Sequence, residues 1–284
     1  MSALAPDWLG AARAATEELR SVLAAAPTTA QRARETGTRG EGGDRTLEID
    51  AAAEEAVFRR LDALHAQGAR FAALSEERGR VDFGCDAAAP VLVVIDPLDG
   101  SKNAKRGLPH HALSLAVAHG VTMADVVLGF VYDFGPGEEW VARQGGGAVL
   151  NGVRLDPGVP ERRVGGKLEL LGIESADPIW VRESADALAG AAHRLRALGA
   201  IAVSLCQVAA ARLDGMVTLR RCRAVDVAAG QLIVREAGGV VAFTGCSDPL
   251  GAPLDVMEPV SPVVAARSVE GLAELARVPT NGGW

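Results

Sequence analysis

The sequence contains no apolar run of about 20 residues, the length that a membrane-spanning helix needs. Its first residues also lack the basic region followed by an apolar stretch that marks a secretory signal. Lysine is scarce, represented by Lys102, Lys105 and Lys167 alone. The formal net charge of −7 argues against nonspecific binding to nucleic acid. We therefore expect no membrane partner and no nucleic-acid partner.

Cysteine is rare as well, and its four members are scattered without a Cys-x-x-Cys pair: Cys85, Cys206, Cys222 and Cys246. This pattern predicts reduced, partly buried thiols in a cytoplasmic protein rather than a disulfide framework or a zinc site. The chain has 284 residues, of which 49% are hydrophobic. That is enough for a sizeable core in one large domain or two packed halves.

The order of expected elements predicts the fold class. Helical periodicity indicates helices at 7–25, 50–67 (with Asp50 as N-cap), 184–198, 207–213, 226–237 and 269–276. Short apolar or β-branched runs indicate strands at 71–75, 91–95, 112–119, 126–132, 139–143, 167–173, 201–204, 216–219, 240–243 and 263–266. We expect an α+β N-terminal half at residues 1–158 and an α/β C-terminal half at residues 159–284, with a soft seam near Pro157–Pro160.

Residues 27–46 differ in composition from the segments around them. They are polar and rich in glycine and arginine, and they end in Gly42-Gly-Asp-Arg-Thr46. We expect a long loop here, which is either a lid over a site or a disordered insertion.

The stretch Val91-Leu-Val-Val-Ile-Asp-Pro-Leu-Asp-Gly-Ser-Lys-Asn103 carries the strongest chemical signal. We expect a buried strand that stops at Pro97, with the carboxylates of Asp96 and Asp99 directly behind it. Carboxylates this close repel each other unless a cation lies between them, and Mg²⁺ prefers such oxygen ligands. A helical turn starting at Gly100-Ser101 would turn free amides toward an anion. The stretch predicts a metal and a phosphate at one place; the alternative is two ordinary aspartate-containing turns.

Two further acids stand at the ends of expected elements. Glu76 follows the strand 71–75, and Asp226 opens a helix of small residues, Asp226-Val-Ala-Ala-Gly230. Asp226 could simply cap that helix. Taken together with Asp96 and Asp99, these acids fit chemistry in which two cations activate a water and neutralise charge on a phosphoryl group.

Three motifs, in order, are similar to the signatures of the inositol monophosphatase superfamily: Glu76-Glu77, Asp96-Pro-Leu-Asp-Gly-Ser101 and Val225-Asp-Val-Ala-Ala-Gly230. The resemblance runs along nearly the whole chain. It implies a layered α-β-α-β-α sandwich, usually dimeric, in which metal ions lie between the halves. It also implies Mg²⁺-dependent hydrolysis of phosphate monoesters, with two or three ions, Mn²⁺ as a substitute and Li⁺ as an inhibitor.

The resemblance also implies roles for single residues. Glu76 and Asp96, with the Leu98 carbonyl, would bind the first ion, and Asp96, Asp99 and Asp226 the second. Glu76 would also serve a third, weaker ion. Ser101, where the family commonly has threonine, would help Glu76 to orient the attacking water, and the amides of Gly100 and Ser101 would hold the phosphate. Asp50, with Asp44 and Thr46 in shortened spacing, matches the family's upstream Asp-x-x-Thr-x-x-Asp pattern loosely, and we carry Asp50 over as catalytic.

Arg220, Arg221 and Arg223 stand where inositol-selective members have a glutamate. Guanidinium groups suit a second phosphate. In this cluster the sequence resembles the archaeal-type subgroup, which hydrolyses both fructose 1,6-bisphosphate and inositol monophosphate. The alternative is a solvated cluster of arginines. We thus expect a phosphatase of small sugar or cyclitol phosphates. The rival hypotheses are a sibling phosphatase of 3′-phosphoadenosine 5′-phosphate or histidinol phosphate, and a non-catalytic metal-binding scaffold.

Overall fold

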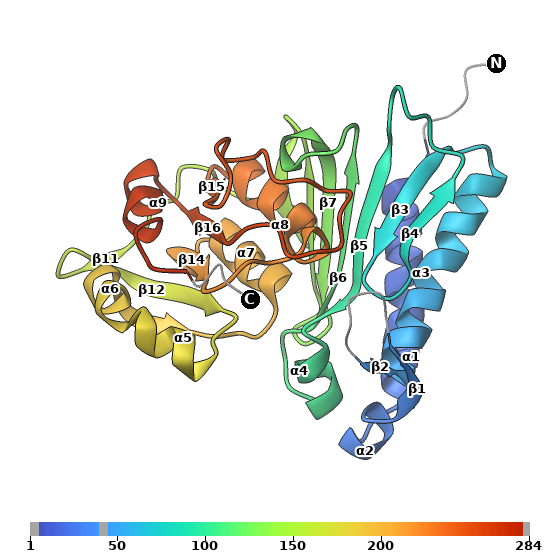
Figure 1. The fold of residues 1–284 in the computed structure, drawn as a ribbon, viewed down its shortest axis with the longest axis horizontal. Coiled ribbons are helices and arrows are strands. Elements are labelled where there is room, and N and C mark those ends of the chain that lie inside the picture. The colour runs from blue at the N-terminus through green and yellow to red at the C-terminus, as the bar shows by residue number, and fades with distance from the viewer. Residues whose placement is uncertain (1–5, 40–44, 281–284) are drawn as a thin grey trace.

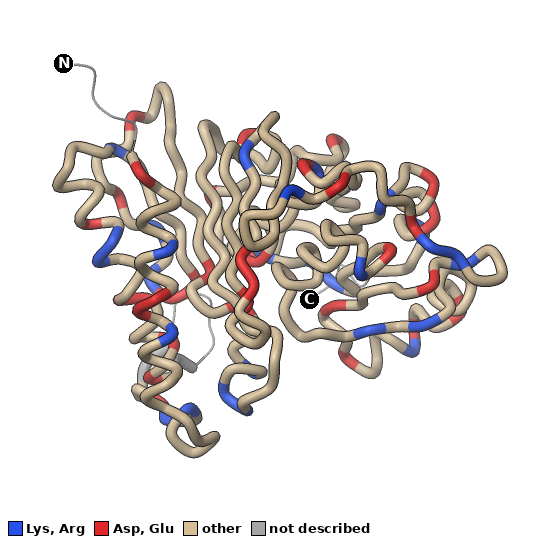
Figure 2. The backbone as a smooth tube through the Cα atoms, turned by 180° about the vertical axis from the view of Figure 1, so that it is seen from behind, with Lys and Arg blue, Asp and Glu red and all other residues tan. Residues whose placement is uncertain are grey.

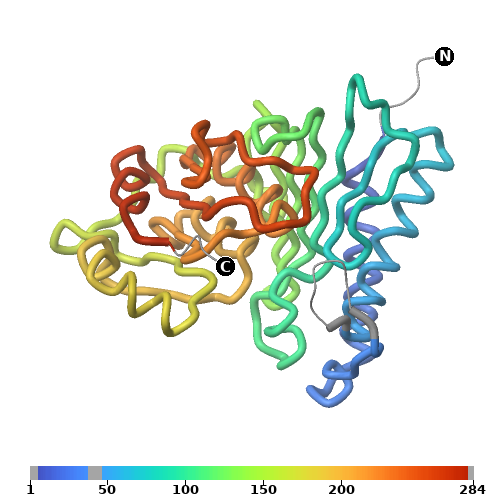
Figure 3. Tube along the Cα trace, in the orientation of Figure 1, coloured from blue at the N-terminus to red at the C-terminus, as the bar shows by residue number. Residues whose placement is uncertain are grey.

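The structure, a computed structural model, describes residues 6–39 and 45–280. Its helices and sheets stack in alternating layers in the order α-β-α-β-α (Figure 1). The first half of the chain, blue to green, lies beside the second half, yellow to red (Figure 3). The predicted fold class is therefore confirmed. No helix within these two ranges combines the length and the apolar content that a membrane span requires.

The larger sheet has eight strands in the order β10-β9-β8-β7-β6-β5-β3-β4. Most neighbours are antiparallel, but β3 and β5 run parallel. The strands are β3 (Phe71–Ser75), β4 (Gly79–Phe83), β5 (Leu92–Asp99), β6 (Ala112–Ala118), β7 (Val126–Asp133), β8 (Glu138–Arg143), β9 (Gly147–Leu150) and β10 (Val153–Arg154). A short 3₁₀ turn, Met123–Asp125, leads into β7.

Helices cover both faces of this sheet because its strands are apolar on both sides. On β5, Val93 and Ile95 pack toward the outer helices, whereas Leu92 and Val94 pack toward the centre of the molecule. The outer helices are α1 (Trp8–Ala25) and α3 (Glu48–Ala66).

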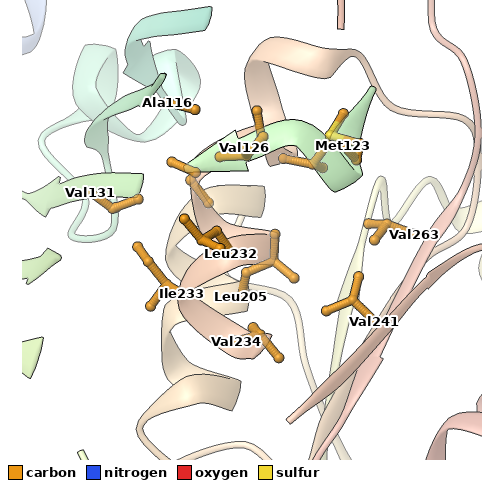
Figure 4. Close-up of a cluster of buried hydrophobic side chains, with 14 of the residues drawn as sticks. Ala116, Met123, Val126, Val131, Leu205, Leu232, Ile233, Val234, Val241 and Val263 are labelled. Carbon is orange, nitrogen blue, oxygen red and sulfur yellow. The ribbon is translucent and has the colours of Figure 1, made fainter. Parts of the chain in front are cut away.

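The middle layer consists of α7 (Ile201–Ala209) and α8 (Ala224–Glu236), which pack against each other and against both sheets. Figure 4 shows Leu205 of α7 beside Leu232 and Ile233 of α8 within this core. Small residues permit the close packing: a Cβ at Gly230 would lie 2.7 Å from the Leu205 side chain, and a Cβ at Gly129 of β7 2.7 Å from the Ala229 carbonyl.

The smaller sheet has the order β11-β12-β14-β16-β15, with β13 beside β12. Its strands are β11 (Arg163–Val164), β12 (Lys167–Glu174), β13 (Ala192–Arg196), β14 (Gly215–Thr218), β15 (Val240–Phe243) and β16 (Val263–Ala266). The outer layer contains α5 (Pro178–Glu183), α6 (Ala185–Ala191) and α9 (Val269–Leu275). Each half of the chain thus supplies one sheet, but α8 joins both into one core, and the boundary at residue 158 remains a prediction.

The expected long loop at 27–46 is wrong for the part that the structure describes. This part forms α2 (Thr29–Arg32), β1 (Glu35–Arg39) and β2 (Arg45–Leu47), and the two strands pair antiparallel. Polar composition suggested a loop, but backbone pairing does not depend on apolar side chains. Residues 40–44, with Asp44, lie outside the described residues, as does the side chain of Thr46. The expectation of a lid remains untested.

Two expectations in the second half are also wrong. The expected strand at 201–204 is the start of α7, and the expected helix at 184–198 is divided into α6 and β13. A short apolar run buried on all sides has no clear period, so sequence cannot distinguish a strand from a helix there. Pairing of β13 with β12, a contact distant in sequence, ends the helical segment at Ala191.

Arg267 connects the predicted boundary between the two halves to the middle helices. It is 7% exposed, and its guanidinium donates to the carbonyls of Pro157, Val159, Ala209 and Ala237 over 2.9–3.3 Å. The last two carbonyls belong to the C-terminal ends of α7 and α8, where helix carbonyls have no partner within the helix.

We predict that Arg267→Met lowers the free energy of unfolding by about 2–4 kcal/mol, because the buried carbonyls of Ala209 and Ala237 lose their donor at once. Urea unfolding followed by circular dichroism measures the change. Arg182→Met, which removes an exposed arginine of α5, should stay within about 0.5 kcal/mol of the wild type. Equal stability of the two variants would contradict the role of Arg267.

Candidate active site

The carboxylates of β5 lie where its pairing with β6 becomes irregular. Asp96 faces Ser114 and Asp99 faces Ala112, so β5 has one residue more than β6 between these pairs. The expectation that Pro97 ends the strand is wrong, because Pro97 occupies this irregular stretch, where the ladder does not need its missing amide. The Asp96 carboxylate accepts from the Leu98 amide at 2.9 Å. Both aspartates are buried.

Glu76 reaches the same edge of the sheet from β3. Because β3 and β5 run parallel, with Ser75 opposite Ile95, the residues that follow emerge side by side. Burial, and then the charges of Glu76, Asp99 and Asp226, hold the pKa of Asp96 well above its usual range. Burial also raises the pKa of Glu76, against the charge of Arg223. Acidic positions accordingly gather near the lower end of the central strands in Figure 2.

Asp99 connects this edge to the middle layer. Its carboxylate accepts from the amides of Ile201 at 3.3 Å and Ala202 at 2.8 Å, at the N-terminal end of α7. Burial and the charge of Asp226 raise its pKa well above the ordinary value, and the two amides act in the opposite direction.

Asp50 and Asp226 occupy equivalent positions in their helices. Each lies in the first turn and accepts from the amide three residues earlier, Leu47 at 3.1 Å and Arg223 at 3.0 Å. The expectation that Asp50 is an N-cap is wrong, since α3 begins at Glu48 and the carboxylate reaches back from inside the helix. Burial raises the pKa of Asp50 to about 7, and its Oδ1 is buried without a hydrogen-bond partner.

The position of Arg223 among the carboxylates was not evident from the sequence, where it was grouped with Arg220 and Arg221. Its guanidinium donates to Glu76 Oε1 at 2.7 Å and to Asp226 Oδ1 at 3.1 Å. Arg220 instead lies over the ring of Trp180, 5.3 Å from its centroid, and Arg221 is exposed. The cation beside the carboxylates is therefore the arginine three residues before Asp226, a relation that depends on the fold.

A cavity of about 320 Å³ opens at the edge of the larger sheet that carries Glu76 and Asp96. Its lining includes five predicted site residues, Asp50, Glu76, Asp96, Leu98 and Ser101, and adds Glu35, Leu47, Glu77, Pro97, Lys102 and Lys105. The lining found for this cavity does not include Asp99, Asp226, Arg220 or Arg221.

The structure places α4 (Ser101–Arg106) at the wall of the cavity and begins it at Ser101, as the sequence predicted. Gly100 precedes it with φ 80°, and a Cβ there would lie 2.7 Å from the His110 carbonyl, so the position requires glycine. Lys102 and Lys105 on this helix supply positive charge to the cavity. A motif search that stops at Ser101 does not identify them.

The donor set fits a hard divalent cation, although the side chains as placed do not form a finished ion site. No group of three histidine, cysteine or acidic side chains in residues 6–39 and 45–280 is arranged to hold one ion. Several buried carboxylates that raise one another's pKa nevertheless share one edge, and Asp50 Oδ1 is without a partner there. An ion with oxygen ligands would relieve both conditions.

The family profile described as the inositol monophosphatase family matches residues 7–278. The chain belongs to the inositol monophosphatase family. Membership confirms the predicted resemblance and the prediction of a phosphate-monoester hydrolase.

Characterised relatives of this family member carry two kinds of name. The fructose-1,6-bisphosphatase/inositol-1-monophosphatase of Thermococcus kodakarensis is 40% identical over 200 residues, 70% of each chain. The Nus factor SuhB of Escherichia coli is 36% identical over 211 residues, 71% of this chain and 73% of its own. Among solved structures, a Pyrococcus horikoshii protein with similarities to inositol-1 monophosphatase has a TM-score of 0.73 at 26% identity, covering 95% of this chain and 97% of its own.

Behind the cavity, Glu54 lies one helical turn beyond Asp50 in α3. It is 2% exposed, its Oε2 accepts from Ser75 Oγ at 2.6 Å, and its Oε1 has no hydrogen-bond partner. Burial raises the pKa of Glu54 to about 7, against the hydrogen bond from Ser75 and the charge of Arg78. Glu54 thus supports the residue that precedes Glu76.

We predict that Glu54→Gln becomes more stable relative to the wild type as the pH rises from 5 to 8. The folded-state pKa of Glu54 is raised above that of the unfolded chain, so its favourable contribution is complete at low pH and is lost as the pH approaches 7. The relative gain should be about 1–3 kcal/mol. Urea unfolding at each pH measures it, and a difference independent of pH would contradict the raised pKa.

Proposed function

We propose that this chain is a Mg²⁺-dependent hydrolase of small sugar or cyclitol phosphates, with inositol monophosphate and fructose 1,6-bisphosphate as its first candidate substrates. The observation that carries the proposal is the convergence of Glu76 and Asp96 at one sheet edge, beside Ser101 and a cavity of about 320 Å³. A volume near the lower end of the range for small-molecule sites suits a compact phosphate ester.

Glu76, Asp96 and the Leu98 carbonyl would hold one ion, and Asp96, Asp99 and Asp226 another. Bound ions would lower the pKa of a water toward neutrality and neutralise charge on the phosphoryl group. Two or three Mg²⁺ ions, replacement by Mn²⁺ and inhibition by Li⁺ are the expectations that follow from the family resemblance. Each assignment of a ligand to an ion is a proposal.

The chain's own residues contribute binding and orientation. Ser101 and Glu76 line the same cavity, which supports a joint role in orienting the attacking water. The amides of Gly100 and Ser101 at the start of α4 would receive the phosphate, and Lys102 and Lys105 add positive charge beside it. Asp50 lies in the same wall with a raised pKa, so it would accept a proton near neutral pH.

The named activities of the archaeal relative support both substrates, and Arg221 is the arginine before Asp226 that supports a second phosphate. Arg221 is exposed, which leaves its guanidinium available to a ligand that extends beyond the cavity. The small cavity gives less support to 3′-phosphoadenosine 5′-phosphate, which is larger than a single sugar ring with its phosphates. Phosphate release with and without Mg²⁺ separates an enzyme from a metal-binding scaffold.

The proposed protein is cytoplasmic and homodimeric. All four cysteines are free, which supports a reducing, cytoplasmic environment. A homodimer is expected from the family resemblance, and size-exclusion chromatography with light scattering would establish the number of chains.

We predict that Asp99→Asn lowers turnover at least about a hundredfold at every Mg²⁺ concentration, because one carboxylate that faces the charged site becomes neutral. The asparagine side chain retains an oxygen that can accept from the Ala202 amide, so the fold should survive. A phosphate-release assay and a circular dichroism spectrum test the two parts. Near wild-type turnover would contradict the assignment.

We predict that Arg221→Ala lowers kcat/KM for fructose 1,6-bisphosphate about tenfold, through loss of a charged hydrogen bond to the second phosphate. The value for inositol 1-phosphate, which has no second phosphate, should change little. An equal loss on both substrates would show that Arg221 does not distinguish them.

A further inference from the structure

The side chain of Arg223 joins two parts of the active site that are far apart in the sequence. Its Nη1 donates to Glu76 Oε1 at 2.7 Å, and its Nη2 donates to Asp226 Oδ1 at 3.1 Å. Its side chain is 20% exposed, and the two carboxylates are 19% and 10% exposed. The contact is therefore largely withdrawn from water, where an ion pair has more effect than on the surface.

Arg223 acts as a counterion for Glu76, Asp96 and Asp226. Burial lowers the pKa of its guanidinium, but the charges of Asp226 and Glu76 outweigh burial and raise it, so the side chain stays positively charged. The same charge opposes the effect of burial on Glu76 and of neighbouring acids on Asp96. The folded chain thus carries a positive charge inside its own anionic site.

The ion proposed at Glu76 and the ion proposed at Asp226 would each approach a carboxylate that Arg223 already contacts. A guanidinium and an ion on the same carboxylate repel each other, so Arg223 weakens ion binding there unless its side chain moves away. The backbone need not move, because the Arg223 amide is held by Asp226 Oδ2 at 3.0 Å and the preceding residue, Cys222, pairs with Ser261. Rotation of the arginine side chain alone would open these oxygens.

We propose that Arg223 competes with divalent cations for the carboxylates of Glu76 and Asp226, and that its displacement sets the ion affinity of this part of the site. The proposal rests on the metal-dependent function proposed above and adds to it a residue that tunes ion binding. It assigns to Arg223 a role different from binding a substrate phosphate.

The test compares ion binding to the full chain before and after Arg223→Met, which keeps an unbranched apolar stem and removes the guanidinium charge. Both proteins are treated with EDTA and dialysed. Binding of Mn²⁺ is then measured by electron paramagnetic resonance and isothermal titration calorimetry, without substrate. Arg143→Met, at an exposed position at the end of β8, is the matched control for the loss of one positive charge.

We predict that Arg223→Met binds at least one Mn²⁺ ion about tenfold more tightly than the wild type, whereas Arg143→Met matches the wild type. The EDTA-treated variant should have a lower Tm than the wild type, and saturating Mg²⁺ should reduce that difference. Unchanged or weaker Mn²⁺ binding by Arg223→Met would overturn the proposal. A wild type that binds no Mn²⁺ would instead contradict the proposed function.

Should Arg223→Met fail to fold, the wild type gives a second measurement. The side-chain Nε–H signal of Arg223, assigned with Arg223→Lys, should shift or broaden on addition of Mg²⁺ in proportion to ion binding. A signal that stays in place at saturating Mg²⁺ would show that the guanidinium keeps its partners, which also overturns the proposal.

Discussion

Repulsion among buried carboxylates is the constraint around which this molecule is arranged. Asp96 and Asp99 are buried near Glu76 and Asp226, and each raises the energy of a neighbour's charge. Such an arrangement is costly unless hydrogen bonds, positive side chains or ions compensate. The fold provides the first two through the amides of α7 at Asp99 and through Arg223 at Glu76 and Asp226. The chemistry proposed for the site provides the third.

The layered architecture explains how acids so distant in sequence meet. Parallel β3 and β5 bring Glu76 and Asp96 to one edge, and the middle helices carry Asp226 and the amides that bind Asp99 to the same place. Both α7 and α8 are packed between the two sheets, and residues along both helices belong to one buried core. The buried acids thus lie on strands and helices of one continuous core rather than on a loop.

Local signals in the sequence predicted much of this arrangement. The buried apolar strand at 91–95, the helical turn at Gly100-Ser101 and a helix ending near residue 237 all depend on neighbouring residues, and all were found. Contacts between distant segments were not predictable in this way. The helical state of Ile201–Ala209 depends on burial from both sides, and the contact of Arg223 with Glu76 depends on how the halves pack. The sequence contains Lys102 and Lys105 in plain view, but only the fold shows that they line the same cavity as Asp50.

The hydrogen bonds of Arg267 have a consequence for the geometry of the acids. This side chain holds the carbonyl ends of α7 and α8, while the opposite ends of the same two helices bind Asp99 and carry Asp226. Helices resist compression along their axes, and α8, with its 13 residues, spans about 20 Å. Arg267, on the far side of the protein, therefore contributes through these two helices to the positions of Asp226 and of the amides that bind Asp99.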